Sequence, residues 1–239
     1  MRSRIKMRLM ATVLAAFMLC IIGPASATTW NAAAGFSTSI NPNGVWTYGS
    51  SNSPGVGIID YESYFILTPT VLEFWNNVAT EVDYDPSVFK NPAVTPTSFS
   101  TLTLPAGALA FHPGQSIATG LYSNIMWTAP AAGNYVINAT FTGYDTKGTQ
   151  TYVYVLVNGI TEYSSEVNGY LASVSYSPTV FSLASGGTVD FAVGATDRGF
   201  NNDTTGIAAT ISSVPVPPTV LLLGSGLLGL VGLKRKFKS

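Results

Sequence analysis

Between residues 28 and 213, hydrophobic and polar side chains alternate along several short segments. Residues 135–142 read Tyr, Val, Ile, Asn, Ala, Thr, Phe, Thr, and residues 189–193 and 206–212 alternate similarly. A period of two places alternate side chains on opposite faces of a β-strand. We therefore predict three strands. One face of the first holds Tyr135, Ile137, Ala139 and Phe141, and one face of the second holds Val189, Phe191 and Val193. In the last strand, Ile207, Ala209 and Ile211 are expected to face inward.

A β-hairpin is predicted at Asn158-Gly159. The flanking segments, 151–157 and 160–167, are rich in β-branched and aromatic residues, which favour strands. An Asn-Gly pair suits a type I′ turn, because both central positions of that turn need a positive φ.

Only residues 70–79 approach a helical period, with Val71, Phe74, Trp75 and Val78 as the apolar positions, and a single short helix is predicted there. Elsewhere, turn signals recur about every eight to twelve residues, a spacing typical of sandwiches. The pattern favours an all-β fold, a single β-sandwich or jelly roll over residues 28–213.

Residues 1–27 have the layout of a secretory signal peptide. Four basic residues up to Arg8 precede an apolar run at 9–22, and Ala25-Ser26-Ala27 is a small-residue cleavage site. We expect a signal helix that engages the Sec export machinery and is removed after Ala27. An uncleaved membrane anchor is the alternative, which the short apolar run disfavours.

Residues 214–239 consist of a proline cluster, an apolar stretch and a basic tip. The apolar stretch, 219–233, would span roughly 23 Å as a helix at ~1.5 Å per residue, and a transmembrane helix is predicted there. By the positive-inside rule the tip stays cytoplasmic, so the tail acts as a stop-transfer segment. A buried helix would leave the cationic tip unexplained; its basic residues are Lys234, Arg235, Lys236 and Lys238.

The three ordered parts of this tail resemble a PEP-CTERM sorting signal of the VPxP type, with Val214, Pro215, Val216 and Pro217 as its motif. The resemblance implies that the chain is the substrate of an exosortase in a Gram-negative bacterium that makes exopolysaccharide and biofilm. It implies a transient inner-membrane anchor, followed by release to the cell surface or extracellular matrix. The usual Glu of the motif is absent, which leaves the cleavage position open. A GPI-type signal has a similar layout, but the basic tip argues against it.

Charge and residue types exclude several functions for the region between these ends. Eight of the eleven basic residues lie in the ends, whereas all twelve acidic residues lie between them, so the middle carries a net charge of −9. Such a surface repels phosphate backbones, and no nucleic-acid partner is expected. With Cys20 inside the signal and His112 as the one histidine, disulfides and Cys- or His-rich zinc sites are excluded.

Two acidic segments are candidates for binding calcium, which prefers hard oxygen ligands. Glu81, Asp83 and Asp85 are spaced two residues apart, and Asp197 and Asp203 lie in a polar loop. The alternatives are a solvated strand face for the first segment and turn-forming residues for the second.

Trp46 and Tyr48 are the candidate platform for stacking on sugar rings, since they follow an Asn-Pro-Asn-Gly segment typical of an exposed loop. Core positions are the alternative for both side chains, because large aromatic residues dominate protein cores. Trp127 is expected in the core.

Segments 111–114, 127–133, 155–159 and 190–194 also resemble a jelly-roll module of carbohydrate-binding type found in other exported proteins with sorting tails. The resemblance implies a surface or matrix protein that binds carbohydrate, with exopolysaccharide as a partner. An adhesive or self-associating surface protein without a small ligand is the alternative. No enzyme is expected, because the sequence has no Gly-x-Ser-x-Gly elbow and no spacing that selects a carboxylate pair.

Overall fold

The computed structural model of the chain describes residues 26–77, 86–115 and 121–215. Within these ranges, Thr29–Ser213 forms one compact unit built from strands, with no α-helix. The all-β prediction is confirmed. The predicted signal helix and transmembrane helix lie outside the described residues, and within those residues no helix has the length and hydrophobicity needed to cross a membrane.

The unit contains two large sheets and a separate hairpin. The strands of the first sheet are β1 (Thr29–Asn31), β4 (Ser63–Ile66), β5 (Glu73–Asn76), β6 (Ser87–Lys90), β9 (Leu109–His112), β11 (Gly133–Gly143), β14 (Ser173–Leu183) and β16 (Thr205–Ser213). The second sheet comprises β2 (Trp46–Ser51), β3 (Ile59–Asp60), β10 (Tyr122–Thr128), β12 (Gln150–Val157), β13 (Ile160–Asn168) and β15 (Thr188–Ala195). The hairpin is β7 (Thr97–Phe99) and β8 (Leu102–Leu104).

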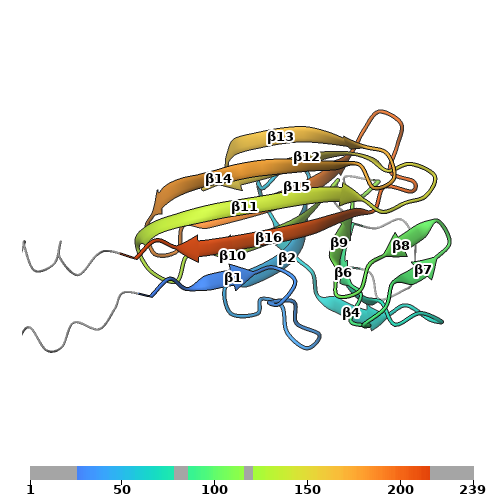
Figure 1. Ribbon diagram of the computed structural model, residues 1–239, viewed down its shortest axis with the longest axis horizontal. Coiled ribbons are helices and arrows are strands. Elements are labelled where there is room, and N and C mark those ends of the chain that lie inside the picture. Colours follow the sequence, from blue (N-terminus) through green and yellow to red (C-terminus); the bar gives the residue numbers. More distant parts are fainter. Residues whose placement is uncertain (1–25, 78–85, 116–120, 216–239) are drawn as a thin grey trace, which may run out of the picture. The chain divides into compact units, whose positions relative to one another are not determined.

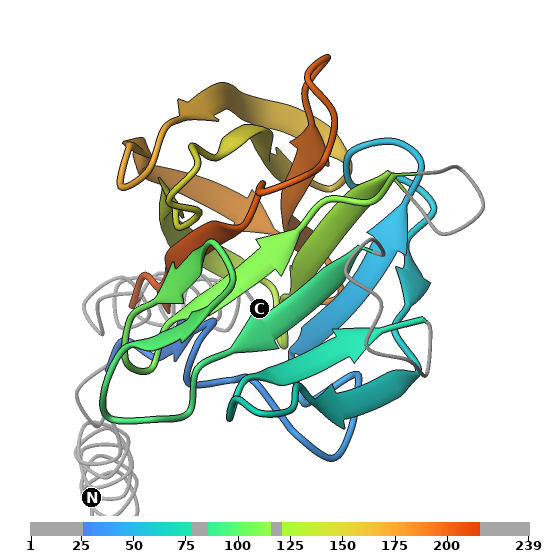
Figure 2. The same ribbon diagram turned by 90° about the vertical axis from the view of Figure 1, so that its right-hand side faces the viewer.

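The strand order places segments that are distant in sequence beside one another. The first sheet runs β14-β11-β16-β9-β6-β5-β4, with β1 on β16, and the second runs β13-β12-β15-β10-β2-β3. Figure 1 shows the sheets as layers, with β11, β14 and β16 in front of β10, β12 and β15. Figure 2 looks onto the end where β4, β5, β6 and β9 extend the first sheet.

The predicted hairpin and alternations are confirmed. Strands β12 and β13 pair with Val157 opposite Ile160, and Asn158 and Gly159 have φ values of 50° and 77°, as the turn requires. Ile207, Ala209 and Ile211 of β16 are buried as predicted, and so are the alternating apolar residues of β11 and β15.

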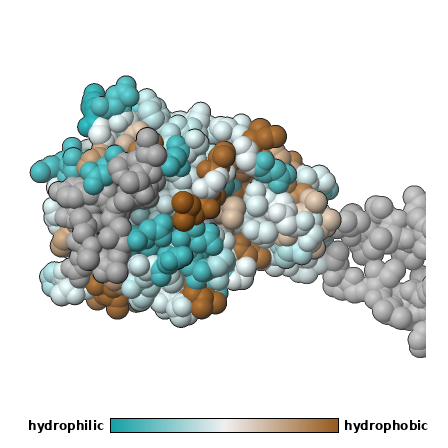
Figure 3. All heavy atoms as spheres, turned by 180° about the vertical axis from the view of Figure 1, so that it is seen from behind, coloured by the Kyte–Doolittle hydropathy of each residue, from teal (hydrophilic) through white to brown (hydrophobic). Residues whose placement is uncertain are grey.

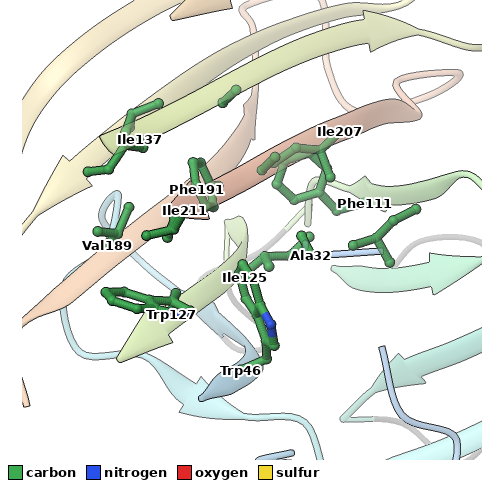
Figure 4. Close-up of a cluster of buried hydrophobic side chains, with 14 of the residues drawn as sticks. Ala32, Trp46, Phe111, Ile125, Trp127, Ile137, Val189, Phe191, Ile207 and Ile211 are labelled. Carbon is green, nitrogen blue, oxygen red and sulfur yellow. The ribbon is translucent and has the colours of Figure 1, made fainter. Parts of the chain in front are cut away.

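The main core fills the space between the two sheets. Strands of both sheets contribute side chains to it, including three valines of β12, and the segment after β1 adds Ala32. Figure 4 shows members from β2, β9, β10, β11, β15 and β16 meeting. Trp127 is fully buried there, as predicted. Burial of each large apolar side chain contributes about 1.5–3 kcal/mol to folding.

A smaller core lies beside the β7–β8 hairpin, and it explains why the predicted helix at 70–79 is wrong. The chain there forms β5, which pairs with β4 and β6. Phe74 stacks on Phe65 at 5.1 Å and on Phe89 at 4.3 Å between ring centroids. Cross-strand aromatic pairing of this kind stabilises a strand, and the apolar spacing alone does not reveal it.

We expect Gly159→Ala to lower the free energy of unfolding by about 1 kcal/mol, because an L-residue is strained at a positive φ. No neighbour lies within 4 Å of a Cβ at this position, so the cost is confined to the backbone. Urea unfolding of the variant measures it. Ser164→Ala, at an exposed position of β13, is the control, and equal losses in the two variants would contradict the account.

Candidate functional site

The predicted platform of Trp46 and Tyr48 is wrong, because both side chains are buried, with exposures of 3% and 0%. Strand β2 lies inside the second sheet, between β10 and β3, and the segment after β1 packs against it. The Tyr48 hydroxyl donates to the Gly35 carbonyl at 3.1 Å, and burial raises the pKa of Tyr48. A Cβ on Gly35 would overlap the indole of Trp46, so the backbone covers that ring directly.

The two predicted acids of the polar loop lie in different surroundings. Asp197 is exposed, whereas Asp203 is 3% exposed and its Oδ1 accepts a hydrogen bond from the Gln150 N–H at 2.7 Å. Burial raises the pKa of Asp203 to about 7, opposed by the Gln150 hydrogen bond and reinforced by nearby Asp145.

Asp145 was not among the predicted site residues. Its carboxylate connects two other segments of the chain by hydrogen bonds. Its carboxylate accepts from the Thr101 hydroxyl at 2.7 Å and from the Thr204 N–H at 2.6 Å. No group of three His, Cys, Asp or Glu side chains suited to a metal ion occurs within residues 26–77, 86–115 and 121–215. Glu81, Asp83 and Asp85 lie outside these ranges, and a calcium site there stays a prediction.

The predicted processing sites lie at the borders of the described residues. Ala27 and Val214 are exposed, and Thr29 pairs with Ser212, so both ends of the unit leave the same part of the first sheet. Pro215 is half-buried, and the other processing residues lie outside the described ranges; they are Ala25, Val216, Pro217 and the basic tip.

The structure brings together three tyrosines on the outer face of the second sheet, and sequence reasoning missed them. This tyrosine group consists of Tyr122 on β10 and of Tyr152 and Tyr154 on β12. Tyr152 and Tyr122 flank Gly194 of β15 in one cross-strand row. Tyr122 and Tyr154 meet edge to face, with ring centroids 5.9 Å apart.

Gly194, at the centre of this row, leaves room for the ring of Tyr122. A Cβ on Gly194 would overlap the ring of Tyr122, so that ring lies over the glycine backbone. Tyr152 remains 42% exposed and Tyr122 and Tyr154 are half-buried. The pKa of Tyr154 is raised to about 12, mainly by burial and also by its charge interaction and hydrogen bond with Tyr122.

A polar pair borders the tyrosine group. Glu166 of β13 lies opposite Tyr152, and its Oε1 accepts a hydrogen bond from the Gln150 amide at 2.7 Å. The Gln150 Oε1 is buried and has no hydrogen-bond partner within the described parts of the chain. Phenol rings with an adjacent carboxylate and amide match sugars, because tyrosine combines an apolar face with a hydroxyl.

The side of the unit that faces away from the viewer in Figure 1 is drawn in Figure 3. Seen from behind, it is mostly white and teal, and the brown hydrophobic residues form separate small groups (Figure 3). Large apolar patches mark protein or membrane contacts, whereas scattered ones are ordinary on a soluble domain.

Comparison with known proteins gives only distant structural similarity. No protein-family model matches the chain, and neither does any curated protein. The carbohydrate-binding module CBM51 of Clostridium perfringens GH95, solved with methyl-galactose, is 11% identical at a TM-score of 0.33, over 64% of this chain and 94% of that one. A family 35 carbohydrate-binding module from Clostridium thermocellum is 14% identical at a TM-score of 0.29, over 54% and 95%.

An enzyme is similar to the same extent. The Stig cyclase Fisc from Fischerella sp. TAU is 13% identical at a TM-score of 0.35, over 72% of this chain and 100% of that one. At these TM-scores the similarity assigns neither a function nor a site, so the functional argument rests on the residues of this chain.

Proposed function

We propose that this chain is an exported protein of the cell surface or extracellular matrix that binds carbohydrate through the tyrosine group. The observation that carries the proposal is the clustering of Tyr122, Tyr152 and Tyr154 on the outer face of a sheet, where Tyr152 is exposed and the other two rings are half-buried. Rings of this kind stack on the C–H faces of sugars, and their hydroxyls bond to sugar hydroxyls. The proposed role is binding rather than catalysis.

The charge of the chain favours a neutral ligand. The region between the two ends carries a net charge of −9, and Glu166 borders the tyrosine group. An anionic polymer would be repelled, whereas a neutral exopolysaccharide pays no such cost. The proposed ligand is therefore a neutral polysaccharide of the matrix.

The proposed route to the matrix uses both ends of the chain. The Sec machinery exports the chain, the signal is removed after Ala27, and the tail 214–239 anchors the protein transiently in the inner membrane. An exosortase then cuts within the proline cluster and releases the unit. The exposure of Ala27 and Val214 supports access by both proteases.

We expect Tyr152→Ala to weaken binding of a neutral polysaccharide by roughly tenfold, about 1.4 kcal/mol. The reason is that Tyr152 is the most exposed ring of the group and loses its stacking contact with the sugar. Titration calorimetry of the purified unit measures the affinity. Tyr170→Ala is a matched control, because Tyr170 is 41% exposed against 42% for Tyr152 but lies in the turn after β13. Equal weakening in both variants would reject the tyrosine group as the site.

Strand β14 favours self-association as a second candidate function. It is an 11-residue edge strand with no charged residue, and Val180 on it is 58% exposed. Edge strands without charge pair readily with other chains. Sedimentation of the purified unit tests this, and a concentration-dependent dimer that Thr179→Lys abolishes would support adhesion through β14.

A further inference from the structure

Asp190 is a buried carboxyl group on the outer face of the second sheet. It belongs to β15 and lies opposite Leu156 of β12 and Met126 of β10, on the outer side of the second sheet. The alternating pattern turns this side chain away from the core, yet it is only 4% exposed. Something outside the sheet must therefore cover it.

The cover is the loop between β2 and β3. Its turn, Ser53 to Val56, is closed by a hydrogen bond from the Val56 N–H to the Ser53 carbonyl at 3.2 Å. Gly55 has a φ of 63°, and a Cβ there would stand 2.7 Å from the Asp190 Oδ2 and 3.0 Å from Leu156. The loop backbone thus lies directly on the carboxyl group.

The carboxyl group beneath the loop is incompletely bonded. The Asn124 Oδ1 accepts a hydrogen bond from the Gly55 N–H of the loop at 3.3 Å, and the Asn124 amide donates to the Ser51 hydroxyl at 2.9 Å. With the amide turned over, Asn124 instead donates to the Asp190 Oδ2 at 3.1 Å. The Asp190 Oδ1 is buried and has no hydrogen-bond partner among the residues that the structure describes. Burial raises the pKa of Asp190 to about 8, and a backbone hydrogen bond with Phe191 opposes the rise.

The elements around Asp190 bring no positive charge to it. The loop 52–58 contains no titratable residue, and the neighbours on β12 and β10 in the same row are apolar. The titratable groups on the outer face of the flanking strands are Tyr122, Tyr152 and Tyr154. Farther out, Asp60 of β3 lies opposite Gly49, the residue that pairs with Asn124. An ionised Asp190 must therefore be solvated by water, and the loop stands in the way.

We propose that the β2–β3 loop is a cover controlled by a proton: it is closed when Asp190 is protonated and opens when Asp190 ionises. Opening exposes the Asp190 carboxylate and the Asn124 amide, which join the tyrosine group as partners for sugar hydroxyls. Asn124 lies in the row beside that of Tyr122, two residues along β10, so the uncovered groups are contiguous with the tyrosines. The sugar contact rests on the proposed function, whereas the opening of the loop does not.

The sign of the pH dependence follows from linkage. An accessible aspartate ionises near pH ~3.9, so between that pH and about 8 the open form holds fewer protons than the closed form. Opening therefore becomes more favourable as the pH rises, by up to about tenfold per pH unit. Below this window the cover stays closed.

Hydrogen exchange at the Gly55 amide, which donates to the Asn124 Oδ1 of the sheet at 3.3 Å, tests the cover without any sugar. After correction for the intrinsic exchange rate, its protection in the wild-type protein is expected to fall by up to about tenfold per unit between pH 5 and pH 8. In Asp190→Asn, which cannot ionise, protection is expected to stay constant. Gly55→Ala, which introduces the close contact and the strained φ, is expected to lose protection already at pH 5. Equal pH dependence in the wild type and Asp190→Asn would overturn the cover.

The contribution to sugar binding is measured separately. If Asp190 and Asn124 contact the sugar when the loop is open, the affinity for a neutral polysaccharide rises between pH 5 and pH 8 in the wild type and stays constant in Asp190→Asn. Binding with the same pH dependence in both proteins would show that Asp190 and Asn124 do not contribute to the sugar site. Absence of binding at every pH rejects the proposed function, while the exchange measurement still decides whether the cover opens.

Discussion

Phe191→Ala is expected to lower the free energy of unfolding by about 3–5 kcal/mol. Phe191 is fully buried on β15, and its strand neighbours are Ile125 and Val155, which are fully buried as well. Truncation leaves a cavity between the two sheets. Because hydrogen bonds to neighbouring strands hold the backbones of both sheets in place, the surrounding side chains can fill little of that cavity. Urea unfolding followed by circular dichroism gives the change.

Phe181→Ala is the matched control for this prediction. Phe181 is half-buried on the edge strand β14, where water and side-chain motion fill the space left by truncation. We expect its loss to be clearly smaller than that of Phe191→Ala. Similar losses at the two positions would contradict a core centred between β11, β16 and the strands β10, β12 and β15.

Neutralising the basic tip is expected to disrupt processing of the tail while leaving the folded unit intact. Each of the charges opposes passage of the tip through the bilayer by ~2.5–3.5 kcal/mol. Without them, the tail slips through the membrane or escapes correct cleavage. The substitutions are Lys234→Gln, Arg235→Gln, Lys236→Gln and Lys238→Gln.

Mass spectrometry of the mature C-terminus measures this effect. Surface protein from wild-type cells should end within the proline cluster, and protein from cells without the sorting protease should keep Ser239. Ser239 on surface protein from wild-type cells would contradict the sorting signal and leave a plain membrane anchor.

Local features of the fold could be predicted because neighbouring residues determine them. Asn158-Gly159 specifies a turn by its own backbone preferences, and the alternation at 135–142 specifies which side of β11 faces inward. The prediction at 70–79 was wrong because β5 depends on Phe65 and Phe89, which come from other strands. Non-local pairing supplies the aromatic contacts that override the local period.

The candidate site was harder to predict for the same reason. The alternation Tyr152-Val153-Tyr154 places two tyrosines on one face of a strand. Tyr122 joins them only because β15 pairs with both β10 and β12, which no local pattern shows. Trp46 was misjudged because its neighbouring Asn-Pro-Asn-Gly segment is a loop, whereas the tryptophan itself begins a buried strand.

The burial of Asp190 could not be predicted from the alternation of hydrophobic and polar residues. The alternation places the Asp190 side chain on the outer face of β15. The loop that covers it lies more than a hundred residues earlier in the sequence. Its burial is therefore a tertiary property. The same loop brings Gly55 within contact distance of both Asp190 and Leu156, which only glycine at this position permits.

Binding of the purified unit, residues 28–213, to an array of neutral and anionic polysaccharides tests whether the tyrosine group is a carbohydrate site. We expect binding to neutral polysaccharides that Tyr152→Ala weakens and Tyr170→Ala leaves unchanged, together with little binding to anionic ones. Binding to none of the polysaccharides, or binding that survives Tyr152→Ala undiminished, would contradict it.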